Sequence, residues 1–163
     1  PPHLMRNLGG GRFRDEAAGS PDLARPMVAR GAAYGDLDGD GDLDVVVSTS
    51  GGPARVFRNL ATARGVRVLL RGVKSNRSGL GAEVRLRAGA RSLTHVVRSG
   101  SSYCSQSELA ATFGLAGAAS AGPLEVRWPS GTVDTVASVA AGELLVVEEG
   151  RGAVERRPLK PPR

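Results

Sequence analysis

Apolar and polar residues alternate with a period of two through most of the chain between residues 65 and 150. Val66, Val68 and Leu70 fall on one face of such a segment, with Arg67 and Leu69 on the other. Successive side chains of a β-strand point to opposite sides, so this alternation predicts half-buried antiparallel strands. Similar runs lie at residues 82–87, 93–97, 124–128 and 144–147, and no long helix is predicted. We therefore expect a sandwich-like antiparallel β domain over residues 61–150.

The first 60 residues carry shorter strand signals. A short apolar run, a glycine-rich turn and an aromatic residue at residues 4–13 predict a β-hairpin. Residues 43–48 contain Val45-Val46-Val47, which predicts a buried strand, and residues 54–59 predict another strand after the turn at Gly51-Gly52-Pro53. Residues 151–163 are basic and proline-rich, and we expect them to form a flexible tail.

An acidic stretch precedes the Val45-Val46-Val47 strand. Five of the sixteen acidic residues fall in the nine positions from 36 to 44. Their spacing places Asp residues at loop positions 1, 3, 5, 7 and 9, with Gly41 at the sharp turn of position 6; the residues are Asp36, Asp38, Asp40, Asp42 and Asp44. Hard oxygen ligands at this spacing favour Ca²⁺, with Asp42 offering its backbone carbonyl. The first six positions match an EF-hand loop, but position 12 is Val47, so a strand follows the loop. The alternative is a solvated acidic turn.

A repeated tetrapeptide indicates repeat architecture. Met5-Arg6-Asn7-Leu8 recurs 52 residues later as Phe57-Arg58-Asn59-Leu60, and this spacing suits one blade built from short strands. Residues 31–47, followed by Val56-Phe57-Arg58-Asn59, resemble the FG-GAP/VCBS repeat family of β-propeller blades. The resemblance implies Ca²⁺ on the side chains of Asp36, Asp38, Asp40 and Asp44 and on the backbone of Asp42. It also implies that residues 1–60 hold the end of one blade and one Ca²⁺-loop blade, with upstream blades in the same parent chain.

Four clusters separate the strands of the second region. They are residues 75–82 (SNRSGLGA), 99–107 (SGSSYCSQS), 112–115 (TFGL) and 128–131 (WPSG). In this order they resemble the ASPIC/UnbV domain, which follows FG-GAP/VCBS repeats in secreted proteins. Two positions depart from that pattern, since Thr112 stands where His is frequent and Ser102 where Gly is frequent. Phe113 and Trp128 are expected to anchor the core. The side chains of the Ser/Gln loop, residues 99–107, are expected to form hydrogen bonds to the backbone of the same loop.

Composition narrows the function. The net charge is +6, which raises the question of nucleic acid, but the Arg residues are spread over alternating strand positions and aromatic residues make up only 4%. We therefore expect no nucleic-acid partner. No apolar run approaches 18 residues, so no membrane insertion is expected, and no signal peptide is recognised in these residues. The abundance of Ala, Gly, Pro and Arg suggests a bacterial, GC-rich coding bias.

Candidate catalytic groups are few. Cys104 is the single cysteine and is expected to be a buried or half-exposed structural thiol; a triad of His95, Ser105 and Asp134 has no support from spacing. Two functions stay open. The first is a Ca²⁺-binding, non-enzymatic extracellular or cell-envelope module for adhesion to a protein or glycan. The second is an enzyme, or a glycan or small-molecule binder, that uses a ligand loop of Asn76, Tyr103, Ser105 and Gln106.

Overall fold

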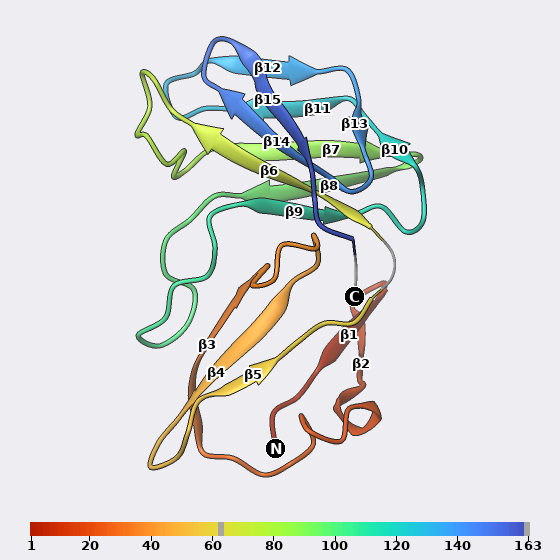
Figure 1. The fold of residues 1–163 in the computed structure, drawn as a ribbon, viewed down its shortest axis with the longest axis vertical. Helices are drawn as coiled ribbons and strands as arrows, with labels where there is room; N and C mark the ends of the chain where they lie inside the picture. Colours follow the sequence, from red (N-terminus) through yellow and green to blue (C-terminus); the bar gives the residue numbers. More distant parts are fainter. Residues whose placement is uncertain (62–63, 162–163) are drawn as a thin grey trace.

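The computed structural model describes residues 1–61 and 64–161, and within these ranges the chain is all-β apart from one 3-10 turn at Ala17–Gly19 (Figure 1). In chain order the strands are β1 (Met5–Gly9), β2 (Arg12–Asp15), β3 (Ala29–Gly35), β4 (Asp44–Thr49), β5 (Arg55–Phe57), β6 (Gly65–Arg71), β7 (Glu83–Ala88), β8 (Arg91–Val96), β9 (Ala111–Gly114), β10 (Ser120–Ala121), β11 (Leu124–Arg127), β12 (Val133–Val136), β13 (Val139–Ala140), β14 (Glu143–Glu148) and β15 (Gly152–Pro158).

The first 61 residues form two small sheets. Strands β1 and β2 make an antiparallel hairpin with Asn7 opposite Phe13, which confirms the predicted hairpin. Strands β3, β4 and β5 form a separate antiparallel sheet with β4 in the middle, and β4 is the strand predicted from Val45-Val46-Val47. Strand β3 therefore lies at an edge of this sheet. In Figure 1 these strands occupy the lower half of the molecule.

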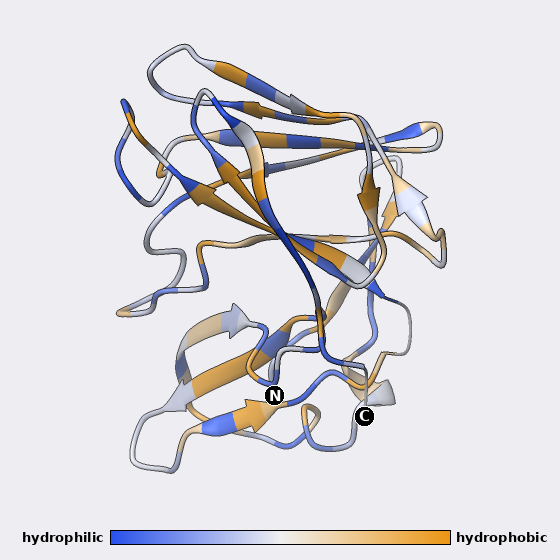
Figure 2. Ribbon diagram, turned by 45° about the horizontal axis from the view of Figure 1, so that its top comes forward, coloured by the Kyte–Doolittle hydropathy of each residue, from blue (hydrophilic) through white to orange (hydrophobic). Residues whose placement is uncertain are grey.

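Residues from 65 onward form two four-stranded sheets, with strand orders β12-β11-β7-β8 and β15-β14-β6-β9, and a short two-stranded sheet of β10 and β13. Their inward side chains form one hydrophobic core, and Figure 2 shows hydrophobic stretches along the strands of both sheets. The alternating residues of the sequence pattern supply this core; the fully buried members include Val66, Val68, Val84, Leu86, Leu124, Val126, Leu145 and Val147. Each such side chain stabilises the fold by about 1.5–3 kcal/mol relative to an exposed one. Phe113 and Trp128 are also buried, as expected.

One expectation about this sandwich is wrong. Strand β6 pairs with β14 in parallel, with Val66 opposite Glu143 and Arg71 opposite Glu148, so the sheet is mixed and not purely antiparallel. Alternation of side chains is the same in parallel and antiparallel strands, so the hydropathy pattern cannot distinguish the two pairings. The pairing places the first strand of this region next to its penultimate strand.

The expected flexible tail is also wrong over most of its length. Gly152–Pro158 form β15, which pairs antiparallel with β14, and Leu159 is buried. The residues of β15 are largely exposed and polar, as on an edge strand with one solvated face, and a period-two apolar signal is therefore weak there. Residues 162–163 of the predicted tail, like residues 62–63 of the predicted second domain, lie outside the described residues.

Candidate metal centre

The Asp-rich stretch is the loop that joins β3 to β4, with Gly35 opposite Asp44 at its base. Gly39 and Gly41 have φ angles of +86° and +96°, which residues with a side chain rarely adopt. Gly41 also has no room for a side chain, because a Cβ there would lie 2.6 Å from Leu159 Cδ1. The sharp turn predicted at Gly41 is confirmed, and the second region of the chain packs directly against it.

Asp36 organises the turn from inside. Its Oδ1 accepts the backbone N–H groups of Gly39 (2.6 Å) and Asp40 (3.1 Å), and its Oδ2 accepts that of Gly41 (3.0 Å). The Asp36 side chain is fully buried. Amide donors converging on one carboxylate form a small anion-binding concavity, which in this loop is filled by the chain's own Asp36.

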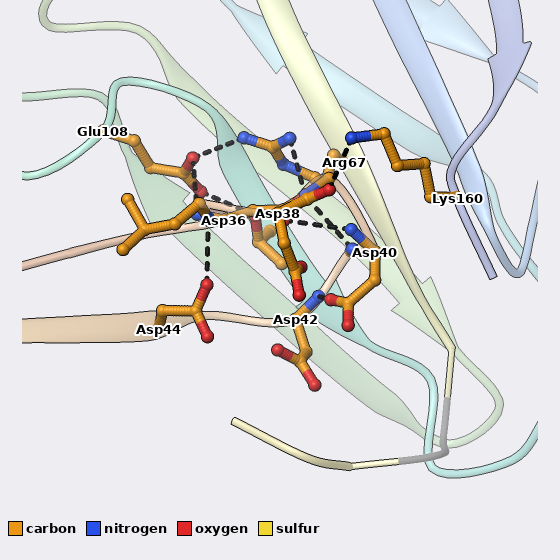
Figure 3. Close-up of polar contacts among 12 residues, drawn as sticks. Asp36, Asp38, Asp40, Asp42, Asp44, Arg67, Glu108 and Lys160 are labelled. Atoms are coloured by element: carbon orange, nitrogen blue, oxygen red, sulfur yellow. Dashed lines mark hydrogen bonds and ion pairs between the residues drawn. The ribbon is translucent and has the colours of Figure 1, made fainter. Parts of the chain in front are cut away.

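Three carboxylates converge on one point. Asp36, Asp38 and Asp40 each offer a carboxylate oxygen, and these oxygens all lie within 4.8 Å of one another (Figure 3). Both Asp38 oxygens and Oδ2 of Asp42 are buried without a hydrogen-bond donor from the described residues. Arg58 Nε lies 2.9 Å from Asp38 Oδ2, but the contact is an ion pair without hydrogen-bond geometry. Buried carboxylate oxygens without donors are costly, so this arrangement favours a bound cation.

The last two Asp residues of the loop have different environments. Burial, followed by the charges of Asp40, Asp44, Asp38 and Asp36, raises the pKa of Asp42 to about 6. The Asp44 carboxylate instead accepts two backbone amides, those of Leu37 (2.9 Å) and Asn59 (2.9 Å), and is 3% exposed. Asp44 therefore ties the loop to the segment that follows β5, and its use as a ligand would be added to this structural role.

The residues of the loop fit a hard divalent cation. Asp36, Asp38 and Asp40 would hold it through carboxylate oxygens, Asp42 through its backbone carbonyl and Asp44 through the remaining capacity of its carboxylate. A Ca²⁺ ion would supply direct ligand bonds to the carboxylate oxygens that have no hydrogen-bond donor among the described residues. The donor set contains no thiolate or imidazole, so it does not suit a soft metal.

Residues beyond position 60 reach the loop and were not predicted from the sequence. Arg67 on β6 donates from Nη1 to Asp36 Oδ2 (2.8 Å) and from Nη2 to Glu108 Oε2, and the same Glu108 oxygen accepts Asp36 N–H (3.2 Å). Lys160 Nζ donates to the Asp38 carbonyl (2.8 Å). Figure 3 shows Glu108, Arg67 and Lys160 around one side of the loop. Because these residues are 31 to 122 positions from their partners, no local pattern identifies them.

The predicted ligand loop does not assemble into one site. Asn76 lies in the connection between β6 and β7, where its side chain bonds both the N–H and the C=O of Leu80 (2.7 Å each). Ser105 Oγ donates to the Tyr103 carbonyl (2.9 Å), and Gln106 bonds Gly100 N–H and the Ser107 carbonyl. Tyr103 is 71% exposed. Figure 1 places the β6–β7 and β8–β9 connections at separate heights on the left side of the molecule.

The remaining reactive groups also lie apart. His95 is half-buried, its ring is edge-on to Phe113, and its pKa is lowered by burial and by Arg98. Ser105 donates to the Tyr103 carbonyl, and Asp134 accepts Trp128 Nε1–H (2.7 Å). Among the described residues, no hydrogen bond joins any two members of the triad considered above. Cys104 is exposed, which corrects the expected buried or half-exposed thiol. It occupies a turn with φ of +46°, whose tip faces solvent.

Two of the buried carboxylates of the second region, Glu149 and Asp134, are each surrounded by hydrogen-bond donors, and we call these two sites the carboxylate nests. Glu149 Oε2 accepts three successive amides, of Val73, Lys74 and Ser75 (2.7 Å each), and its Oε1 accepts the hydroxyls of Ser75 and Ser130. Burial acts to raise the pKa of Glu149, but these hydrogen bonds outweigh it and lower the pKa to about 2.

Asp134 is the second nest. It accepts the Trp128 indole N–H and the amides of Gly150 (2.8 Å) and Gly152 (3.1 Å). The two nests join the SNRSGLGA loop, the WPSG turn and the β14–β15 connection. Two of the four sequence clusters therefore serve the fold.

Comparison with known proteins agrees with both resemblances. The FG-GAP-like repeat family matches residues 1–47, and the ASPIC and UnbV family matches residues 72–154. Over 122 residues the chain is 37% identical to cartilage acidic protein 1 of Xenopus tropicalis, covering 70% of this chain and 18% of that protein. The chain thus spans about a fifth of the length of this curated relative. Among the described residues, no helix has the length and apolarity needed to cross a lipid bilayer.

These matches indicate an extracellular-type module. The ASPIC and UnbV match begins at the end of β6 and ends within β15, so it includes the two nests and most of the two four-stranded sheets. The FG-GAP-like match includes the whole Asp-rich loop. This chain belongs to the ASPIC and UnbV family and carries an FG-GAP-like repeat before that domain.

Proposed function

We propose that this chain is a Ca²⁺-binding, non-catalytic extracellular module for adhesion or ligand binding. The observation that carries the proposal is the convergence of Asp36, Asp38 and Asp40 within 4.8 Å, with both Asp38 oxygens buried and lacking a hydrogen-bond donor among the described residues. Millimolar Ca²⁺ outside the cytoplasm suits a loop with a Kd of about 10⁻⁴–10⁻³ M, as in extracellular modules.

The proposal includes a propeller setting. We propose that β3–β5 form a blade and that β1–β2 complete a preceding blade supplied by the same parent chain. Large exposed apolar side chains concentrate in the first 60 residues, and a neighbouring blade would cover such a surface. They are Leu4, Met5, Leu8, Phe13, Val28, Leu37, Val56 and Leu60.

An enzyme or small-molecule site at the ligand loop has less support. Ser105 and Gln106 form hydrogen bonds to the backbone of their own loop, and Asn76 does the same in another loop. Tyr103 alone offers an exposed aromatic face, which suits a glycan ligand better than a reaction. The names of the matched families and of the relative point to no reaction.

Calorimetry tests the central claim. Titrating CaCl₂ into protein freed of metal with EDTA should give one binding event per chain, and saturation at about 100 times Kd should stabilise the fold by about 2.7 kcal/mol. Mg²⁺ should bind more weakly, because it demands a tighter octahedral shell.

Two variants complete the test. Asp38→Ala should abolish both the heat and the thermal shift, since it removes the ligand whose oxygens lack donors. Asp22→Ala is the matched control, because Asp22 lies outside the loop and, within the described part of the chain, forms an ion pair only with exposed Arg25. Absence of heat and of a thermal shift at about 10 mM Ca²⁺, ten times the weakest expected Kd, would contradict the proposal.

A further inference from the structure

We infer that the ASPIC/UnbV domain holds the Asp-rich loop in its metal-binding conformation, and that cation binding in turn tightens the docking of this domain on the β3–β5 sheet. The inference rests on the proposed Ca²⁺ function and assigns positioning roles to Glu108, Arg67, Ser102 and Ser107. Two contacts carry it, one at the loop itself and one along the edge of β3.

At the loop, one carboxylate and one guanidinium of the second domain bracket Asp36. Glu108 Oε2 accepts Asp36 N–H (3.2 Å) and an Arg67 N–H, while the other end of the Arg67 guanidinium donates to Asp36 Oδ2 (2.8 Å). Arg67 and Glu108 side chains are 13% and 14% exposed, so water competes little with these contacts. Thr112 Oγ1 orients the second Glu108 oxygen (3.1 Å). The backbone and carboxylate of the first metal ligand are therefore set by residues of the other domain.

Along β3, the hydroxyl-rich segment 99–107 of the second domain covers the strand edge. Ser102 Oγ accepts Ala32 N–H (3.1 Å), Ser107 Oγ accepts Tyr34 N–H (3.2 Å), and the Tyr34 carbonyl accepts Glu108 N–H (2.9 Å). At Gly31 the approach is so close that a Cβ would lie 2.4 Å from both Ser105 Oγ and the Tyr103 carbonyl. An edge strand otherwise exposes such groups, and here side-chain hydroxyls take the place of a neighbouring strand.

The two contacts are continuous. Strand β3 ends at Gly35, directly before Asp36, so a shift of the strand edge moves the first metal ligand. Leu159 and Lys160 contact the turn at two further points, Gly41 and the Asp38 carbonyl. A cation that fixes the loop therefore favours the docked arrangement, and docking favours the cation by the same factor, since coupling between two sites is reciprocal.

The test uses a double variant that touches no metal ligand. In the full chain, Ser102→Ala with Ser107→Ala should weaken Ca²⁺ binding by calorimetry by about fivefold or more, at the low end of typical coupling. Ser92→Ala is the matched control, because Ser92 is an exposed strand hydroxyl of the same domain, and it should leave the affinity unchanged. Ser102→Thr keeps a hydroxyl and should bind Ca²⁺ like the wild type, whereas Ser102→Ala alone should bind more weakly.

Amide hydrogen exchange supplies the reciprocal measurement. Adding Ca²⁺ to the wild type should slow exchange at Ala32 and Tyr34, whose N–H groups bond Ser102 and Ser107. The coupling would be contradicted, and the metal site left intact, if the double variant folds and binds Ca²⁺ with wild-type affinity. It would also be contradicted if Ca²⁺ does not change the exchange rates of the Ala32 and Tyr34 amides. Absence of Ca²⁺ binding by the wild type would overturn both. Should the double variant not fold, the Ser102→Ala and Ser102→Thr pair decides the matter.

Discussion

The Asp-rich loop and the carboxylate nests solve the same problem in opposite ways. Both bring carboxylates out of water into tight turns. Glu149 and Asp134 meet only N–H and O–H donors, from backbone, serine and tryptophan. In the loop, Asp38 and Asp42 lie among other carboxylates, and three of their four oxygens are buried without a hydrogen-bond donor from the described residues, although Arg58 forms an ion pair with Asp38. A carboxylate with internal donors is stabilised by the fold itself, whereas a cluster without such donors favours a bound cation, as proposed above.

The largest loss of stability should come from removing the Glu149 carboxylate from its hydrogen-bond donors. Glu149→Ala leaves the amides of Val73, Lys74 and Ser75 without their acceptor, and buried donors without partners are costly. We expect the Tm measured in EDTA to fall by on the order of 10 °C. Glu125→Ala is the control, because Glu125 pairs with an exposed Arg127, and its Tm should change by less than about 2 °C. Equal shifts for the two variants would show that the nest is dispensable.

Low pH should also reduce stability through Glu149. The folded-state pKa of Glu149 is about 2, below its ordinary value of 4.5, because its hydrogen bonds outweigh the effect of burial. A lowered pKa means that the carboxylate stabilises the fold above pH 4.5 and that this stability is lost as the pH falls towards 2. Urea unfolding in EDTA at a series of pH values should show this loss. The dependence should flatten in Glu149→Gln; an unchanged profile would assign the acid sensitivity to other groups.

A smaller loss should follow from trimming the second nest. Trp128→Phe removes one donor from Asp134 but leaves the amides of Gly150 and Gly152 in place. Because the lost bond is to a carboxylate in the protein interior, we expect the free energy of unfolding to fall by about 1–3 kcal/mol in urea titrations. Trp128→Ala should cost more, since it also removes core packing. If Trp128→Phe has wild-type stability, the indole N–H has no role beyond packing.

Neutralising a carboxylate of the Asp-rich loop should increase stability in EDTA, in contrast to the losses expected at the nests. Asp42→Asn removes one charge from a group of five and places an amide donor near unpartnered oxygens, so in EDTA we expect a gain of up to about 1 kcal/mol. Glu149→Gln under the same conditions should lose stability, because a side-chain N–H would then face N–H donors. Thermal denaturation of both proteins side by side measures the difference. Destabilisation by both variants would remove the distinction between the two regions.

Much of the fold follows from local pattern. Alternation at Val66, Val68, Val84 and Leu86 identified the strands that build the sandwich core, because half-burial leaves a period-two signal. The same signal is silent about partners, which is why the parallel β6–β14 pairing was not predicted. Strand β15 was missed for a related reason, since its side chains mostly face water and carry no alternation.

The candidate site divides in the same manner. Asp36, Asp38 and Asp40 could be grouped from spacing because one loop contains them all. Glu108, Arg67 and Lys160 could not, because only the tertiary structure brings them to the loop. In the ligand loop predicted from polar residues, Asn76 and Gln106 form short-range hydrogen bonds to the backbone, which the residue types alone do not distinguish from ligand contacts.

The parallel pairing of β6 and β14 also sets an order of events during synthesis and refolding. Strand β6 lies inside its sheet, between β9 and β14. It can pair on both sides only after β14 has been synthesised, because Val66 lies opposite Glu143. Pairings so distant in sequence close slowly, because the intervening chain must be ordered first. A nascent chain that has passed Gly114 but not reached Glu143 therefore presents an open strand edge to its surroundings. Contacts from Leu159 and Lys160 reach the Asp-rich loop last of all, so a loop that is synthesised before the second domain is completed only after that domain.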